Sequence, residues 1–544
     1  MDYRNAAECL NLLQRLHPMN VEETHAALSI MVVGMLEALP PPNQHLEVLE
    51  AARAMICYVQ GEFSRRYATH PLPPDSLENE TLLRVVTLWR NLARSYARIA
   101  RHDAHDGTLD DQRALLFQRR LFYAGQAVIE FFRAHRAVQA GLWAELHESY
   151  AAADAAQLAR IRVADPQNEV WKAQSTLEAY AAVLLVDLAN PYGRTERELA
   201  WVCRWAQRFA PYCELGVDTE PQKPNMYGLD LGTDQGLRPL GLLAQSTRLH
   251  RFDGSKLAGQ IQAVLTQFKQ GVKPSSLGLG EDCSTEACAR LLLSLYRPWG
   301  LAAAGRRFPR RGSSGEVELS CDWLAIGFHV NGKVFEQPRL YGQTPGLNSD
   351  ISLLTFGERV PVADNPARAT QRRQREAEEL GFVCERWEVV DQSVGGFRLQ
   401  QHPRAERLEH HQLVGLRPQD SQRFLLGHIS WLMFRADGIL EAGAHILAGV
   451  PSLVAVRAVG LHSGRAPFHQ GFMLPATPAL KTEASLVLPA GWYHAKGIVE
   501  VFQDGALRQF RMLQLMLKGA NFDQVSFEPV VPSAASAAPA ESAR

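Results

Sequence analysis

Apolar residues recur at helical spacing through the first half of the chain. One such series runs from Leu28 to Leu39 and ends at three consecutive prolines. Similar series follow one another, separated by short polar loops, as far as Leu295. The pattern predicts an all-α helical array over residues 1–298, built as one or two subdomains. A segment rich in Gly, Pro, Asp and Asn, residues 216–241, is typical of a long loop within this array.

The apolar pattern changes to period two after residue 299. Val317 and Leu319 alternate with polar neighbours, and further strand-like runs, including residues 323–330, continue to Phe527 with turns between them. A charged, helix-like stretch interrupts these runs and indicates an insertion at about residues 338–386. Helices followed by strands in this order predict the α+β fold class.

The numbers of basic and acidic residues are nearly equal, 57 against 58. We therefore expect no overall attraction to a nucleic acid polymer or an anionic membrane, and any anion site must be local. The chain starts without an apolar leader, and no apolar run is long enough to span a bilayer. These features predict a cytoplasmic protein with no membrane span.

The eight cysteines are scattered and never form C-x-x-C. This spacing favours reduced, mostly core-packing thiols over a disulfide framework or a zinc site. The histidines, including His410 and His411, lack the spacing of metal ligands, so we expect no metal. Neither the phosphate-binding motif G-x-x-x-x-G-K-[ST] nor the nucleophile motif G-x-S-x-G occurs, and we expect no catalytic residues.

An arginine cluster stands just before the first predicted strand. Arg306, Arg307, Arg310 and Arg311 place four guanidinium groups within six residues. A guanidinium group is planar and donates parallel hydrogen bonds to a phosphate, or to O6 and N7 of guanine, and it can stack on a base. The cluster is therefore a candidate arm for binding an anionic nucleotide.

An acidic turn lies between two later strand patterns, at Asp391, Ser393 and Gly396. A short carboxylate can accept hydrogen bonds from the N–H edge of a purine, and glycine lets a ligand approach the backbone closely. The same residues are also common in ordinary turns, so the turn could join two strands and bind nothing.

Together the two motifs resemble the signature of PilZ-type cyclic di-GMP receptors, R-x-x-x-R before a barrel and then D/N-x-S-x-x-G at a strand turn. Arg306 and Arg310 fit the first pattern, with Arg307 and Arg311 as an overlapping pair, and the acidic turn fits the second. The resemblance covers about residues 300–450. It implies a six-stranded antiparallel β-barrel, with the arginine arm wrapping cyclic di-GMP against its surface.

The sequence departs from this pattern in its spacing. About 80 residues separate Arg310 from Asp391, whereas the two motifs of the family are usually separated by only a few tens of residues. Arg368 and Arg372 also fit R-x-x-x-R and lie at the usual distance, but they fall in the charged, helix-like insertion. We prefer Arg306 and Arg310, because a strand pattern follows them directly.

The resemblance implies a division of the chain into a helical module, 1–298, a PilZ-like barrel with its insertion, 299–450, and a small β domain or barrel extension, 451–529. Residues 530–544 are mostly Ala, Ser and Pro, and they are expected to be disordered.

The resulting hypothesis is a non-enzymatic cyclic di-GMP receptor, in which ligand binding at the barrel is coupled to an unidentified protein partner of the helical module. One alternative is an interaction scaffold whose barrel has lost ligand binding. A single-stranded nucleic acid binder ranks third, because the arginines precede the strands rather than alternating with aromatic residues on them.

Overall fold

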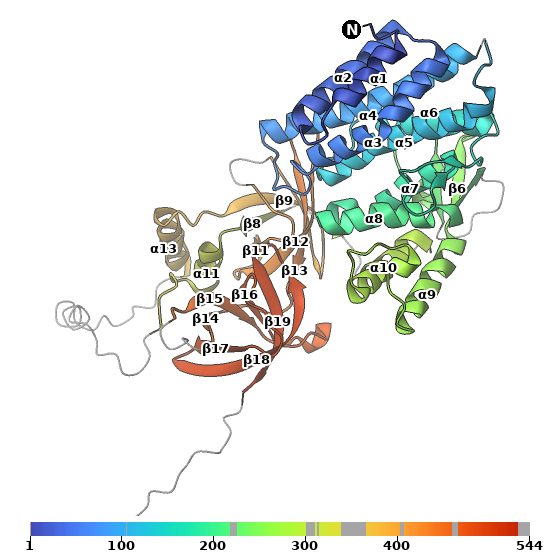
Figure 1. Cartoon of the computed structure of the whole chain (residues 1–544). Helices are drawn as coiled ribbons and strands as arrows, with labels where there is room; N and C mark the ends of the chain where they lie inside the picture. The colour runs from blue at the N-terminus through green and yellow to red at the C-terminus, as the bar shows by residue number, and fades with distance from the viewer. Residues whose placement is uncertain are drawn as a thin grey trace, which may run out of the picture. The chain divides into compact units, whose positions relative to one another are not determined.

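The computed structural model describes residues 2–104, 106–217, 226–300, 311–312, 315–338, 366–402, 407–459 and 466–530. The chain divides into two compact units. The first, here called the helical unit, comprises Met1–Arg307 together with Leu432–Leu440. The second, here called the β unit, comprises Phe308–Trp431 and Glu441–Arg544. Most of the helical unit is drawn in blue to green, and most of the β unit in yellow to red (Figure 1).

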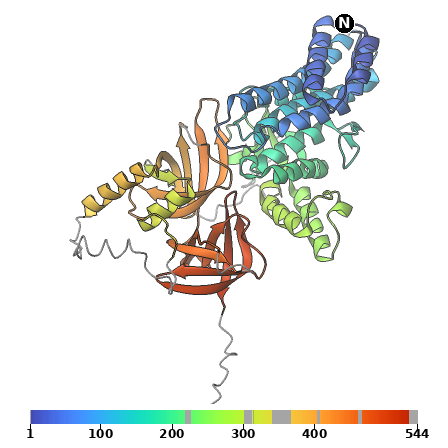
Figure 2. The same cartoon turned by 60° about the vertical axis from the view of Figure 1, so that its left-hand side comes forward.

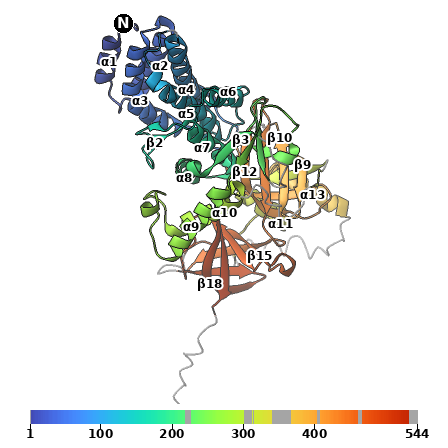
Figure 3. The same cartoon turned by 90° about the vertical axis from the view of Figure 1, so that its right-hand side faces the viewer.

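The helical unit contains the helical array expected from the apolar periodicity (Figure 3). Its longest helix, α4, starts at a capping box in which Asp75 accepts from the backbone N–H of Glu78, and Glu78 accepts from that of Asp75. Behind the cap, residues from Leu82 to Ile99 at helical spacing are buried and form part of one core. The α-helices are α1 (Ala6–Arg15), α2 (Val21–Ala38), α3 (Pro42–Ser64), α4 (Ser76–Asp103), α5 (Arg113–Arg133), α6 (Leu142–Ala155), α7 (Thr176–Leu188), α8 (Glu196–Phe209), α9 (Ser255–Lys269) and α10 (Thr285–Gly300).

The segment predicted as a long loop, 216–241, instead contributes to a sheet, and this prediction is wrong. The sheet has the strand order β3-β6-β4-β5. These strands are short, and both β3 and β4 pair with β6, which lies later in the chain, so no local alternation predicts them. Their bounds are β3 (Glu214–Val217), β4 (Tyr227–Asp230), β5 (Arg238–Pro239) and β6 (Leu249–Asp253). A separate pair, β1 (Val163–Ala164) and β2 (Ala173–Gln174), lies between α6 and α7.

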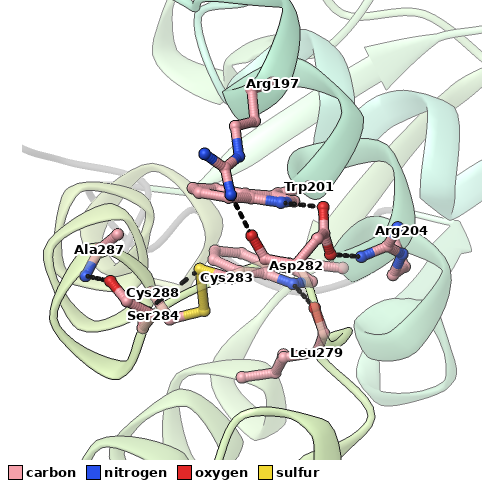
Figure 4. Close-up of a disulfide and its surroundings, with 10 residues drawn as sticks. Arg197, Trp201, Arg204, Leu279, Asp282, Cys283, Ser284, Ala287 and Cys288 are labelled. Atoms are coloured by element: carbon pink, nitrogen blue, oxygen red, sulfur yellow. Dashed lines mark hydrogen bonds and ion pairs between the residues drawn. A yellow bond between two sulfur atoms is a disulfide. The ribbon is translucent and has the colours of Figure 1, made fainter.

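The expectation that all cysteines are reduced is wrong for one pair, because Cys283 and Cys288 form a disulfide (Figure 4). The loop before α10 is held against α8 by the carboxylate of Asp282, which accepts from Trp201 Nε1 at 2.7 Å and from Arg204 Nη1 at 2.6 Å. Cys283 lies in this anchored loop and Cys288 in α10, and their Cα atoms are 6.0 Å apart. The other six cysteines are free thiols.

The β unit begins with a six-stranded barrel. Its sheet has the order β10-β13-β12-β11-β8-β9-β7, and an additional pairing of β9 with β10 closes six of these strands into a ring with β7 attached to β9. The described pairings are antiparallel, which confirms the predicted α+β class with an antiparallel barrel after the helices. The strands are β7 (Arg311–Gly312), β8 (Glu316–Ser320), β9 (Glu385–Ser393), β10 (Gly396–Gln401), β11 (Leu413–Pro418), β12 (Leu425–Phe434) and β13 (Leu440–Ile446).

The stretch 323–330, predicted as a strand, forms the helix α11 (Trp323–Asn331). Asp322 caps it by accepting from the N–H of Ala325 at 2.7 Å. The segment is apolar almost throughout, so its periodicity does not distinguish a strand from a helix. The helix places Ile326 in a core cluster that also includes Leu413 of the first barrel and Phe472 of the second.

Within the predicted insertion at about 338–386, the structure describes the helix α13 (Pro366–Glu379), which agrees with the helical pattern there. Residues 339–365 lie outside the described part.

The C-terminal region forms a second closed barrel, with the order β14-β15-β16-β19-β18-β17 (Figure 2). It is a barrel with its own core, which includes Val456, Leu486 and Val501. Disorder is predicted for residues 530–544, and all of these except Val530 lie outside the described part. The predicted domain boundaries also stay predictions. The strands are β14 (Ser452–Ala458), β15 (His469–Leu474), β16 (Ser485–Pro489), β17 (Ile498–Gln503), β18 (Ala506–Lys518) and β19 (Phe522–Pro529).

Candidate functional site

The acidic turn lies at the end of β9, where three strands of the first barrel meet. Asp391 has a direct partner on each side: Gly312 of β7 and Arg398 of β10. One residue further along β9, Gln392 is the partner of Arg311. The last arginine of the predicted arm therefore enters the sheet directly beside the acidic turn, in the same ladder.

A β-bulge sets the direction of Asp391. Arg398 pairs with Asp391, but the next residue of β10, Leu399, pairs with Val389, so Val390 is an extra residue in β9. Without the bulge, alternation along the strand would put Asp391 on the same face as the buried Val389. With it, Asp391 shares a face with its partner Arg398, opposite to the face of the buried Leu399.

The turn between β9 and β10 is held against β13. Ser393 and Gly396 are partners at its base, and Ser393 Oγ donates to the carbonyl oxygen of Gly396 at 3.4 Å. The carbonyl of Gly395 accepts from the N–H of Ile446 at 3.0 Å. Gly396 has φ of +155°, and a Cβ atom there would lie 2.1 Å from the carbonyl oxygen of Ala444. Glycine is required at this position because the β13 backbone approaches it so closely.

Arg398 lies beside the acidic turn as the strand partner of Asp391, and the sequence prediction did not include it. Its Nη2 and Nε atoms lie 2.7 Å and 3.2 Å from the same oxygen, Oε2 of Glu441. The Arg398 side chain is 38% exposed, whereas that of Glu441 is only 4% exposed. The sequence signal for Arg398 was its position two residues after the motif glycine, but only the strand register shows that it faces Asp391.

The structure brings some of the predicted site residues together. Asp391, Ser393 and Gly396 lie within one hairpin, and Arg311 lies on the neighbouring strand. Arg306, Arg307 and Arg310 fall outside the described residues. Of the alternative pair, Arg368 and Arg372 belong to α13, where Arg372 is exposed and the side chain of Arg368 is outside the described part.

A cavity of about 600 Å³ lies elsewhere in the β unit, lined by residues of β8, β11, α11 and α13. Its charged side chains include Arg417 and Glu318, which form an ion pair, and Arg417 also lies over the ring of Phe424 at 5.2 Å. Cys384 also lines the cavity, and burial raises the pKa of its thiol to about 12. This thiol is therefore protonated at neutral pH. None of the residues of the acidic turn lines this cavity.

Among the described residues, no three His, Cys, Asp or Glu side chains form a group that could hold a metal ion. None of the described helices is both long and apolar enough to cross a membrane.

Comparison with known proteins agrees with this architecture at both ends of the chain. Residues 7–222 match the sequence model described as "Cyclic-di-GMP receptor FimW, N-terminal domain", and residues 454–530 match the "FimW C-terminal beta-barrel domain". The second match coincides with the barrel of β14–β19. A relative from Pseudomonas aeruginosa, named "Cyclic-di-GMP receptor FimW", is 20% identical over 96% of this chain and 90% of its own length. With two domain matches that together cover more than half of its length and a relative that aligns almost end to end, the chain belongs to the FimW family.

Proposed function

We propose that this protein is a receptor that binds cyclic di-GMP on the first barrel of the β unit, between the arginine arm and the acidic turn. The observation that carries the proposal is the pairing of Gly312 with Asp391, which brings the end of the arginine cluster to the acidic turn. The description of the matched family and the name of the relative support the same ligand.

The roles of the residues follow from their chemistry. Arg306, Arg307, Arg310 and Arg311 supply guanidinium groups for the two phosphates and the bases of the ligand. Asp391, turned outward by the bulge, accepts from the N–H groups of a guanine, and Ser393 lies at the base of the same turn. Gly396 contributes indirectly, because it lets the turn pack closely on β13.

Ligand binding can act on the connection between the two units. The arginine cluster lies in sequence between α10, which ends at Gly300, and β8, which begins at Glu316. A ligand that binds the cluster therefore constrains the segment joining the helices to the barrel. It shifts the protein toward the conformations for which the ligand has the higher affinity. The helical unit would then present a surface to a protein partner, in a cytoplasmic protein that acts as a receptor rather than an enzyme.

Isothermal titration of the full-length protein with cyclic di-GMP tests the proposal. We expect saturable binding with micromolar or tighter affinity, and GTP at the same concentration should not reproduce it. Asp391→Ala should weaken binding at least 10-fold, since a charge-assisted hydrogen bond contributes about 1.5–3 kcal/mol. The absence of binding by the intact protein would reject the proposal and favour the interaction scaffold.

A further inference from the structure

A further arginine, Arg398, flanks Asp391 on the side away from the arginine arm. Gly312 of β7 is the partner of Asp391 on one side, and Arg398 of β10 is its partner on the other. Directly opposite residues in antiparallel strands carry their Cβ atoms about 5 Å apart on the same face. The side chains of Asp391 and Arg398 therefore project from adjacent points of one surface.

Glu441 holds the guanidinium of Arg398 in one orientation. Both Nε and Nη2 donate to Oε2 of Glu441, which uses one edge of the planar group. Because the Glu441 side chain is 4% exposed, moving Arg398 away would cost a buried carboxylate two hydrogen bonds from a cation. The guanidinium of this 38% exposed side chain is thus held by Glu441 through Nε and Nη2, and Nη1 takes no part in that contact.

The ion pair changes what Arg398 can recognise. Its positive charge is largely offset by Glu441, so it attracts a phosphate less than the arm does. Its remaining edge still presents two parallel N–H donors in a fixed plane. This geometry suits the O6 and N7 acceptors of guanine, which arginine binds in a bidentate way. The edge of guanine that donates to a carboxylate, N1 and N2, adjoins O6 on the same ring.

We infer that Arg398 contacts the ligand by donating to O6 and N7 of one guanine. Asp391 accepts from the N–H edge of the same guanine, and Glu441 is the residue that positions Arg398. This inference rests on the proposed function. It gives the site a determinant of guanine specificity on the barrel itself, separate from the arginine arm.

The test is a double-mutant cycle between the protein and the ligand. Removing Arg398 alone would take two charge-assisted hydrogen bonds from the buried carboxylate of Glu441 and destabilise the protein, so the variant changes both residues: Arg398→Met with Glu441→Gln. The matched control is Arg417→Met with Glu318→Gln, an ion pair of similar hydrogen-bond geometry between β11 and β8 of the same barrel. Each protein is titrated with cyclic di-GMP and with its analogue in which both guanines are 7-deazaguanine, which has a carbon in place of N7. Thermal unfolding checks that all variants are folded.

The wild type and the control pair variant should bind the 7-deaza analogue about 10-fold or more weakly than cyclic di-GMP, the loss expected for half of a bidentate contact. The Arg398→Met/Glu441→Gln variant should bind cyclic di-GMP about 10- to 100-fold more weakly than the wild type, and its 7-deaza penalty should fall clearly below that of the wild type and the control, because the contact of Arg398 with N7 is lost. A 7-deaza penalty that is as large in this folded variant as in the wild type, or that is absent from the wild type, overturns the inference. If the wild type binds no cyclic di-GMP at all, the proposed function itself has failed.

Discussion

Gly312 and Asp391 are direct partners in the antiparallel ladder of β7 and β9, although the whole predicted insertion of the first barrel lies between them in the sequence. Because β7 begins at Arg311, the arginine cluster immediately precedes the residue that stands beside the acidic turn. The alternative pair belongs to α13, which is not part of this ladder. The register therefore supports Arg306 and Arg310 as the ligand-binding pair, and it leads to the first prediction.

Arg306→Ala with Arg310→Ala should weaken cyclic di-GMP binding about 100- to 1,000-fold, since each substitution removes charge-assisted hydrogen bonds of about 1.5–3 kcal/mol. Arg368→Ala with Arg372→Ala should change the affinity less than about 3-fold. Isothermal titration at one fixed salt concentration measures both variants. The reverse order of effects would assign the ligand to the helical pair.

Gly396→Ala should lower the free energy of unfolding by about 2 kcal/mol, because the new Cβ would overlap the carbonyl oxygen of Ala444. Gly312→Ala is the control, since no described atom lies within 4 Å of a Cβ there, and its effect should stay below about 0.5 kcal/mol. Urea unfolding followed by circular dichroism gives both values. Equal stabilities of the two variants would mean that the close packing of the turn on β13 is not as described.

Arg119→Met should destabilise the helical unit by about 3–5 kcal/mol, the range measured when one partner of a buried ion pair is removed. Arg119 is 1% exposed, and its guanidinium lies 3.0 Å from Glu50 and 3.5 Å from the fully buried Asp165. Its neighbour Arg120 pairs with the exposed Glu148, so Arg120→Met should cost less than about 1 kcal/mol. Denaturant titrations of the two variants compare adjacent residues on one helix, and similar losses would contradict the prediction.

Stability should fall as the pH drops below 6.5, partly through His428. Burial, and then the nearby His445 and His411, lower its pKa from 6.5 to about 4. Between these two values the unfolded chain binds a proton that the folded protein does not, so acid favours unfolding, by roughly 3 kcal/mol at pH 4. Above pH 6.5 both states are neutral and the effect vanishes. His428→Phe should flatten the dependence of unfolding free energy on pH within this window, and an unchanged slope would show that His428 does not titrate there.

Protein purified without reductant should contain one disulfide. When it is denatured and alkylated with iodoacetamide, mass spectrometry should find six modified cysteines, the free thiols described above. Cys283 and Cys288 have a sequence separation of 5, and closing so short a loop contributes about 2 kcal/mol to the free energy of unfolding. Cys283→Ser with Cys288→Ser should show that loss in urea unfolding. Alkylation of all eight cysteines would contradict the assignment.

Features of this protein that depend on local periodicity or on residue chemistry can be predicted from the amino-acid sequence. The buried stripe of α4 repeats at helical spacing within one segment, and so it could be read without the fold. The same holds for the helix α13 and for the change to strand patterns after residue 299. The acidic turn was recognisable because its residues are close together in the sequence.

Features that depend on contacts between segments far apart in the sequence become visible in the folded structure alone. The strands β3 and β4 form by pairing with β6, and the helix α11 buries Ile326 in a core cluster with residues of both barrels. Likewise the bulge at Val390 and the register of β10 place Arg398 beside Asp391. A pattern along the chain records how a residue alternates with its neighbours, but it does not record which strand will lie opposite, and that pairing decides which side chains share a surface.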